Sequence, residues 1–185
     1  MEIVGIDYSL TSPCLCVCKG NFAYAHCKFH YLTDQKSKMG SVTPKILGHQ
    51  YPSFNNDEER YDKISQWAYD IISELSSPIV CIEGYAFNAT GQVFNIAENC
   101  GLLKHKLFKN GIPFNMITPT VVKKFATGRG NASKQDMYDS FLVETDHDIL
   151  SIISSKSKNI GNPVSDIVDA YFIASYQAQH LPVVS

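Results

Sequence analysis

The sequence predicts an α/β fold in which a mixed β-sheet is flanked by helices. Three apolar runs near the N-terminus have the length and close spacing of an antiparallel meander. Beyond residue 57, helical and strand-like segments alternate, which is typical of parallel strands joined by helices. We therefore expect five strands, three antiparallel and then parallel ones, in a single domain spanning residues 1–185.

The N-terminal third contains the three antiparallel strands and a long connection. The strands are expected at "EIVGIDY", "PCLCVCK" and "FAYAHCKFHY", residues 2–8, 13–19 and 22–31. The stretch at 31–56 is polar, has no clear periodicity and contains Gly40, Pro44, Gly48 and Pro52. We expect a loop insertion there, because clustered Gly and Pro residues interrupt regular elements.

A helix is predicted over residues 57–76, where apolar residues recur at i, i+3 and i+4 and the first turn is acidic. The remaining elements follow in the order strand, helix, strand and three helices, at residues 79–87, 91–109, 113–118, 119–127, 134–144 and 164–179. The strand at 79–87 is apolar enough to be buried on both faces, as parallel strands usually are.

The six cysteines indicate a reduced protein core. Cys14, Cys16 and Cys18 alternate along one strand and so point to one face of the sheet. No CxxC pair or zinc-like spacing is present. The N-terminus lacks a secretion signal, and no stretch of about 18 apolar residues could span a bilayer. We expect a soluble, cytoplasmic protein with no membrane partner.

Positive charge is concentrated in one part of the chain, although the net charge is −2. The segment 104–134 contains no Asp or Glu and seven basic residues: Lys104, Lys106, Lys109, Lys123, Lys124, Arg129 and Lys134. Such segregation is expected of a surface that binds a phosphate backbone, although a merely solvated basic face has the same pattern. Lys36, Lys38 and Lys45 lie in the mixed-charge segment 31–56 and are expected outside that surface.

Four acidic residues stand in apolar surroundings. Asp7 and Glu83 each end an apolar strand, and their carboxylates meet if those strands are neighbours. Asp166 and Asp169 share one face of an apolar helix at i, i+3 spacing. Each could also be a turn or capping residue. Carboxylates that converge repel one another, so either these four do not meet or divalent cations bind between them.

A carboxylate site of this kind favours Mg²⁺, with Mn²⁺ able to substitute. Two such ions about 4 Å apart can hold the attacking water and the leaving oxygen of a phosphodiester hydrolysis. A metal site beside a segregated basic segment therefore predicts a nuclease.

Four segments resemble the signature segments of RuvC-type Holliday junction resolvases, in the same order: "VGIDYS", "VCIEGYAF", "VVKKFATGRGNASKQDM" and "VSDIVDAYFIAS". The resemblance covers most of the chain apart from residues 31–56. It implies an RNase H-like fold and a homodimer with two Mg²⁺ ions per active site. It also implies paired symmetric nicks in four-way DNA junctions, which leave 5'-phosphate and 3'-hydroxyl ends.

The resemblance also assigns roles to individual residues. Asp7 would bridge both metal ions, Glu83 would bind one, and Asp166 with Asp169 would bind the other. Lys123, Lys124, Arg129 and Lys134 would contact phosphates, and Gly128 and Gly130 would let the loop approach the DNA backbone closely. From the charge pattern alone, Lys104 and Lys106 are further candidates for DNA binding. The family commonly has an aromatic wedge three residues after the strand-end Glu, where this chain has Ala86. Tyr85 and Phe87 flank that position and are the aromatic candidates for stacking on a junction base.

Three alternatives remain open at this stage. An RNase H-like nuclease acting on forks, flaps or RNA/DNA hybrids would use the same four acids. An actin-like ATPase would need a second such domain, which 185 residues do not hold. A catalytically dead junction-binding module would be expected to have lost acids. For a homodimer, the helix at 91–109 is the expected interface, with apolar candidates Val93, Ile96, Ala97, Leu103 and Leu107.

Overall fold

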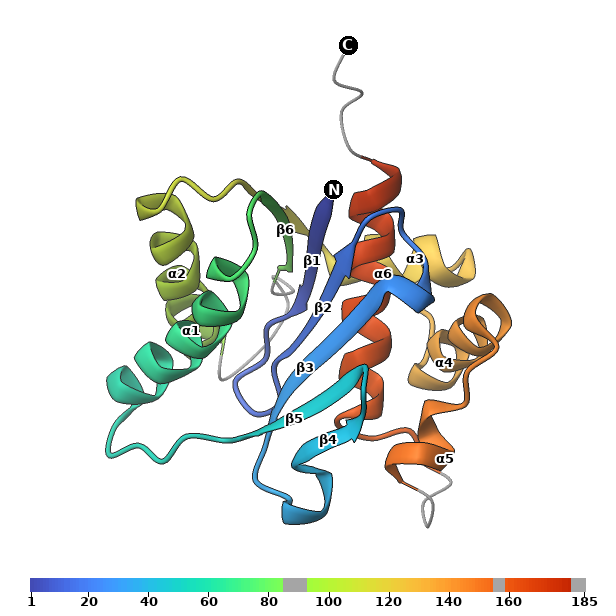
Figure 1. The fold of residues 1–185 in the computed structure, drawn as a ribbon, viewed down its shortest axis with the longest axis horizontal. Coiled ribbons are helices and arrows are strands. Elements are labelled where there is room, and N and C mark those ends of the chain that lie inside the picture. The colour runs from blue at the N-terminus through green and yellow to red at the C-terminus, as the bar shows by residue number, and fades with distance from the viewer. Residues whose placement is uncertain (85–92, 155–158, 181–185) are drawn as a thin grey trace.

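The structure is a three-layer sandwich with a mixed β-sheet between two groups of helices (Figure 1). The computed structural model describes residues 1–84, 93–154 and 159–180. The strands are β1 (Glu2–Asp7), β2 (Cys14–Lys19), β3 (Cys27–Thr33), β4 (Gly40–Thr43), β5 (Ile46–Gln50), β6 (Pro78–Glu83) and β7 (Phe114–Ile117). They lie in the order β4-β5-β3-β2-β1-β6-β7.

The centre of the sheet is the predicted antiparallel meander β1–β2–β3, extended by parallel strands on the β1 side. Strand β6 pairs parallel with β1, and β7 pairs parallel with β6. The mixed α/β fold class is therefore confirmed.

The prediction of five strands is wrong, because the sheet has seven. The two additional strands lie in the segment 31–56, which was expected to be a loop. Strand β5 pairs parallel with β3, and the short β4 pairs antiparallel with β5. Their sequences escape recognition because they are short, polar and interrupted by glycine, so that pairing with β3 rather than local propensity forms them. Strand β3 also begins later than predicted, since Tyr24–His26 form a 3-10 turn.

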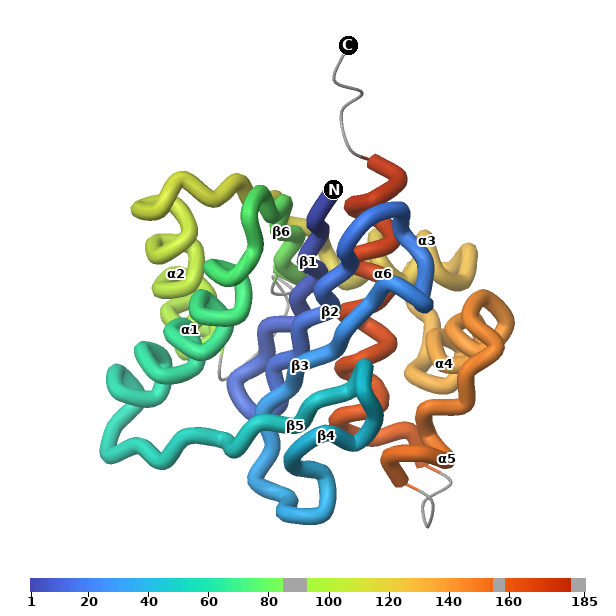
Figure 2. The backbone as a smooth tube through the Cα atoms, viewed as in Figure 1, coloured from blue at the N-terminus to red at the C-terminus, as the bar shows by residue number. Residues whose placement is uncertain are grey.

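Helices cover both faces of the sheet, as the backbone trace also shows (Figure 2). Helices α1 (Asp57–Ser73) and α2 (Val93–Lys109) pack on one face. The other face is covered by α3 (Pro119–Thr127), α4 (Lys134–Thr145), α5 (Ile149–Ile153) and α6 (Val164–Gln179). The five-residue α5 was not predicted. None of the described helices is long and apolar enough to cross a membrane.

All six cysteines are free and buried, as the alternating pattern in β2 predicts. Cys14, Cys16 and Cys18 point to the α6 side of the sheet, where they pack with Phe29 and Tyr31 of β3. They act as small apolar side chains in the larger of the two cores.

Helix α6 touches the central strand β1 at Gly5. A Cβ atom built on Gly5 would lie 2.3 Å from the backbone nitrogen of Ala174 and 2.4 Å from the carbonyl oxygen of Ala170. Both atoms belong to the helix backbone, so no side-chain rotation can make room. Only glycine at position 5, facing alanines at 170 and 174, allows the helix to lie this close to the strand.

We predict that Gly5→Ala destabilises the protein by at least about 3 kcal/mol, since overpacking against backbone atoms cannot be relieved locally. The free energy of unfolding measured in urea tests this value. Gly161→Ala is the control, because a Cβ at that exposed position meets nothing within 4 Å. Equal stabilities of the two variants would show that α6 can move away from β1 at little cost.

Candidate active site

Two of the predicted acids lie at the ends of adjacent parallel strands. In the register of β1 and β6, Ile6 is opposite Ile82, so Asp7 and Glu83 follow at the same edge of the sheet. Both side chains are partly exposed at this edge, whereas the residues that precede them are buried. The strands therefore bring these two carboxylates together, as their positions in the sequence suggest.

Helix α6 adds the other two acids to the same place. The helix packs on β1 and β2, and Asp166 and Asp169 lie in its first two turns. Apart from burial, the pKa of Asp7 is raised by the negative charges of Glu83, Asp166 and Asp169. We refer to these four residues as the acidic cluster.

Burial and mutual repulsion make the cluster hard to ionise completely. Burial is the main cause that raises the pKa of Asp7 well above its usual range. Burial and the charge of Asp169 raise the pKa of Glu83 to about 8, and burial and the charge of Asp166 raise that of Asp169 to about 6. Four carboxylates at this edge therefore need positive charge beside them at neutral pH.

Asp166 differs from the other three acids because hydroxyl groups hold both its oxygens. Ser12 Oγ donates to Oδ2 at 2.5 Å, and Ser165 Oγ donates to Oδ1 at 3.2 Å. Only 6% of Asp166 is exposed. The two hydroxyl groups oppose the effect of burial, which nevertheless raises its pKa.

Asp7, Glu83 and Asp169 make no hydrogen bond or ion pair with any residue that the structure describes. Partly exposed carboxylates without protein partners are the oxygen donors that hard divalent cations prefer. The donor set therefore fits such an ion. Within the described ranges, no three His, Cys, Asp or Glu side chains form a ready-made metal site as they stand.

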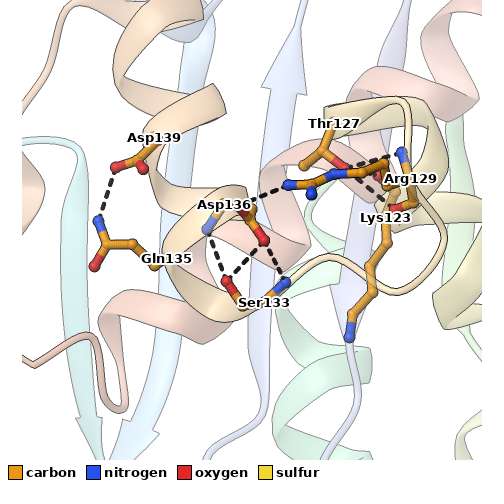
Figure 3. A network of polar contacts seen from close by, with 7 residues as sticks. All are labelled: Lys123, Thr127, Arg129, Ser133, Gln135, Asp136 and Asp139. Atoms are coloured by element: carbon orange, nitrogen blue, oxygen red, sulfur yellow. Dashed lines mark hydrogen bonds and ion pairs between the residues drawn. The ribbon is translucent and has the colours of Figure 1, made fainter.

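Two lysines of the basic segment, Lys123 and Lys134, face the acidic cluster. Both positive charges oppose the rise in the pKa of Asp169, and the charge of Lys123 also opposes the rise in the pKa of Glu83. Lys134 Nζ donates to Ser165 Oγ at 3.2 Å. Lys123, Lys134 and Asp169 share the lining of a small cavity of about 80 Å³. In Figure 3, no dashed line joins the Lys123 amino group to the other residues drawn.

Other basic residues of the segment are already paired with acids. Arg129 donates to Asp136 Oδ1 at 2.8 Å, and Asp136 also caps α4 through Ser133 (Figure 3). Lys106 forms an ion pair with Asp62 of α1 at 3.0 Å. These two cations are thus partly neutralised, unlike Lys123 and Lys134.

Lys124 is exposed on α3, and Lys104 is half-buried on α2. Gly128 ends α3 with a φ of +79°, a left-handed conformation that favours glycine. At Gly130, an added Cβ would lie 3.3 Å from the carbonyl oxygen of Thr120. Tyr85 and Phe87, the two aromatic candidates, lie outside the described residues.

Four polar residues of the site were not identified from the sequence. The Ser12 hydroxyl group donates to Asp166. The Ser165 hydroxyl group, which contacts Asp166, also lies 3.1 Å from Asn162 Oδ1. Lys38 Nζ donates to the carbonyl oxygen of Asn162 at 2.9 Å. Lys38, which was expected outside the basic surface, therefore lies beside the turn that precedes α6. Ser12 lies two residues before β2, and no local pattern marks Ser12 or Lys38.

Comparison with known proteins shows similarity to resolvases in sequence and in fold. No family model matches the chain. Over 105 residues it is 30% identical to the crossover junction endodeoxyribonuclease RuvC of Corynebacterium diphtheriae, covering 56% of this chain. The matched part spans 64% of the length of that curated relative.

The fold is similar to that of solved resolvases. The Thermus thermophilus RuvC structure aligns with a TM-score of 0.59 and 17% identity, covering 97% of this chain and 96% of that one. The Fowlpox virus resolvase, solved with its substrate Holliday junction DNA, aligns with a TM-score of 0.54 and 11% identity over 97% of each chain. The predicted resemblance to RuvC-type resolvases and the RNase H-like fold are thereby confirmed.

We predict that Asp7→Asn raises the stability of the metal-free protein, because it removes one charge from a cluster of like charges. A gain of about 1 kcal/mol would raise the melting temperature by about 2–4 °C. The same variant should lose most of the stabilisation that Mg²⁺ gives the wild type through preferential binding to the folded state.

Thermal melts in chelator and in Mg²⁺ measure both effects. Asp139→Asn, on the exposed side of α4, is the matched control and should melt like the wild type in both conditions. A metal-free Asp7→Asn protein less stable than the wild type would contradict the repulsion described above.

Proposed function

We propose that this chain, which resembles RuvC-type Holliday junction resolvases in sequence and in fold, is a metal-dependent endonuclease that cuts four-way DNA junctions. The observation that carries the proposal is the acidic cluster. Four carboxylates from β1, β6 and α6 meet at one edge of the sheet, with Lys123 and Lys134 beside them. Metal-dependent hydrolysis of a phosphodiester uses this combination of metal ligands and cations that can contact a phosphate.

The acidic cluster would hold two Mg²⁺ ions, with Mn²⁺ able to substitute. The bound ions would supply the positive charge that activates water and stabilises the leaving oxygen. Asp7, Glu83 and Asp169 are the principal ligands in this proposal, because no residue that the structure describes forms a hydrogen bond with their oxygens. Asp166 is oriented by Ser12 and Ser165 and therefore contributes less directly.

The lysines beside the cluster would hold the DNA strand in place during cleavage. Lys123 and Lys134 lie beside Asp169 and would contact the phosphates next to the cut. Lys124 and the glycine-containing turn at 128–130 would contact the backbone further away, whereas Arg129 and Lys106 must first exchange their acidic partners. Hydrolysis would leave 5'-phosphate and 3'-hydroxyl ends.

We also propose that residues 1–185 form one nuclease domain and act as a homodimer wherever DNA is replicated and recombined. A roughly two-fold symmetric junction is cut symmetrically by two sites related by a similar axis. The interface residues predicted from the sequence need correction, because Leu103 and Leu107 are fully buried in the core of the protomer. On the exposed side of α2, Phe94 and Phe108 are 76% and 75% exposed.

Helix geometry supports α2 as the interface. Positions 94, 101, 105 and 108 lie on one stripe along the helix, and an added Cβ at Gly101 would meet nothing within 4 Å. A flat stripe with an aromatic ring near each end and a glycine between them suits close packing against a second copy of the helix.

The decisive test of the proposed activity uses the acids. Asp7→Asn, Glu83→Gln and Asp169→Asn should each lower cleavage of a labelled four-way junction in Mg²⁺ more than tenfold, equivalent to at least about 1.4 kcal/mol in the barrier. Junction binding in chelator should persist, because the basic residues are unchanged. Asp166→Asn should be the mildest of the four variants.

Parallel assays on a flap, a fork and an RNA/DNA hybrid identify the preferred substrate. Faster cutting of one of these than of the four-way junction would favour the alternative nuclease. Wild-type levels of cleavage by any of the first three variants would exclude that residue as a principal metal ligand.

A second test concerns the dimer. The double variant Phe94→Ser with Phe108→Ser should sediment as a monomer, since it removes both aromatic rings from the interface stripe. Val143→Ser is the control, because Val143 is 88% exposed on α4 in the opposite helical layer. A wild-type protein that is monomeric both alone and with junction DNA would contradict the proposal.

A further inference from the structure

The segment that follows β3 is held firmly against the sheet. It contains a 3-10 turn at Lys36–Lys38, between β3 and β4. The hydroxyl group of Tyr31, a fully buried residue of β3, donates to the carbonyl oxygen of Lys38 at 2.7 Å. The backbone of Lys38 therefore has a fixed position relative to the sheet.

A glycine in β5 makes this position possible. A Cβ atom built on Gly48 would lie 2.0 Å from the Lys38 carbonyl oxygen, so any other residue would push the turn away. Strand β5, which the sequence did not predict, thus helps to position the backbone of Lys38.

From this position, the Lys38 side chain points toward the acidic cluster. Its Nζ donates to the carbonyl oxygen of Asn162, four residues before Asp166. Its charge also acts on Asp166, where it opposes the rise in pKa that burial causes. Residues separated by more than 120 positions in the sequence therefore meet at the N-terminal end of α6.

A second lysine reaches the N-terminal end of α6 from another element. Lys134 of α4 donates to Ser165 Oγ in the first turn of α6, and Ser165 in turn contacts Asn162 and Asp166. Lys38 and Lys134 thus both end at the N-terminal end of α6, one from the turn between β3 and β4 and the other from α4.

Lys38 also keeps its charge available. Among the described residues, the ion pairs involve Lys19, Lys63, Lys106 and Arg129, and Lys38 is in none of them. An ammonium group has three N–H donors, and the Asn162 carbonyl takes one. Two donors remain for an anionic ligand at the edge where the acidic cluster lies.

We propose that Lys38 contacts a phosphate of the bound DNA strand beside the acidic cluster, so that the turn between β3 and β4 forms part of the DNA-binding surface. This inference rests on the proposed function, since it requires that DNA lies across the cluster. It extends the proposed binding surface from the acid-free segment 104–134 to the mixed-charge segment 31–56.

The test is the salt dependence of junction binding in chelator, followed by fluorescence anisotropy of a labelled four-way junction. Each phosphate contact to duplex DNA contributes about 0.9 to the slope of log K against log[salt]. Lys38→Ala and Lys38→Gln should both lower the slope by about 0.9, and Lys38→Arg should restore it. Lys36→Ala is the matched control, since Lys36 is exposed in the same turn, and should keep the wild-type slope.

The glutamine variant separates a phosphate contact from a purely structural role. Glutamine has an N–H donor for the Asn162 carbonyl but no charge. A wild-type slope for Lys38→Gln, or equal slopes for the Lys38 and Lys36 variants, would overturn the inference and leave the nuclease proposal standing. Failure of the wild-type protein to bind any branched DNA would overturn both.

Discussion

The close contact between α6 and β1 at Gly5 is the constraint on which the rest of the structure depends. It lets the helix backbone lie directly on the central strand, where any side chain larger than hydrogen would separate them. The same contact brings Asp166 and Asp169 to the edge where Asp7 and Glu83 end their strands. A small residue in the core thus determines the geometry of a site whose nearest acid is two positions away in the sequence.

That geometry creates an electrostatic problem that the protein solves only in part. Burial raises the pKa of each acid, repulsion between carboxylates adds to the rise for Asp7, Glu83 and Asp169, and the described residues supply hydroxyl groups to Asp166 alone. Within the described part of the chain, the other three carboxylates have no hydrogen-bond partner, and Lys123 and Lys134 act on them without forming ion pairs. Such an arrangement leaves carboxylate oxygens available to a divalent cation, which agrees with the proposed nuclease chemistry.

The extension of the sheet by β4 and β5 shows how a second constraint of the same kind operates. Gly48 and Tyr31 fix the turn at Lys36–Lys38, and this turn directs Lys38 to the start of α6. At both Gly5 and Gly48, a glycine allows two backbone segments to make contact. Each contact positions charged side chains at the edge of the sheet where the acidic cluster lies. The proposed DNA-binding surface therefore comes from three separate parts of the chain, on β3–β4, α3 and α4.

The sequence predicted the fold class, five of the seven described strands and five of the six described helices, and it singled out the four acids as candidates for one site. These features follow from local patterns: apolar runs end in Asp7 and Glu83, and Asp166 and Asp169 share a helix face. Only the three-dimensional structure reveals strands β4 and β5, the ion pair of Arg129 with Asp136, and the positions of Ser12 and Lys38 near Asp166. It also showed that Leu103 and Leu107 belong to the core, whereas Phe94 and Phe108 are exposed. The reason is physical: periodicity reports which residues are buried in an element, but contacts between distant segments depend on how closely two backbones can approach.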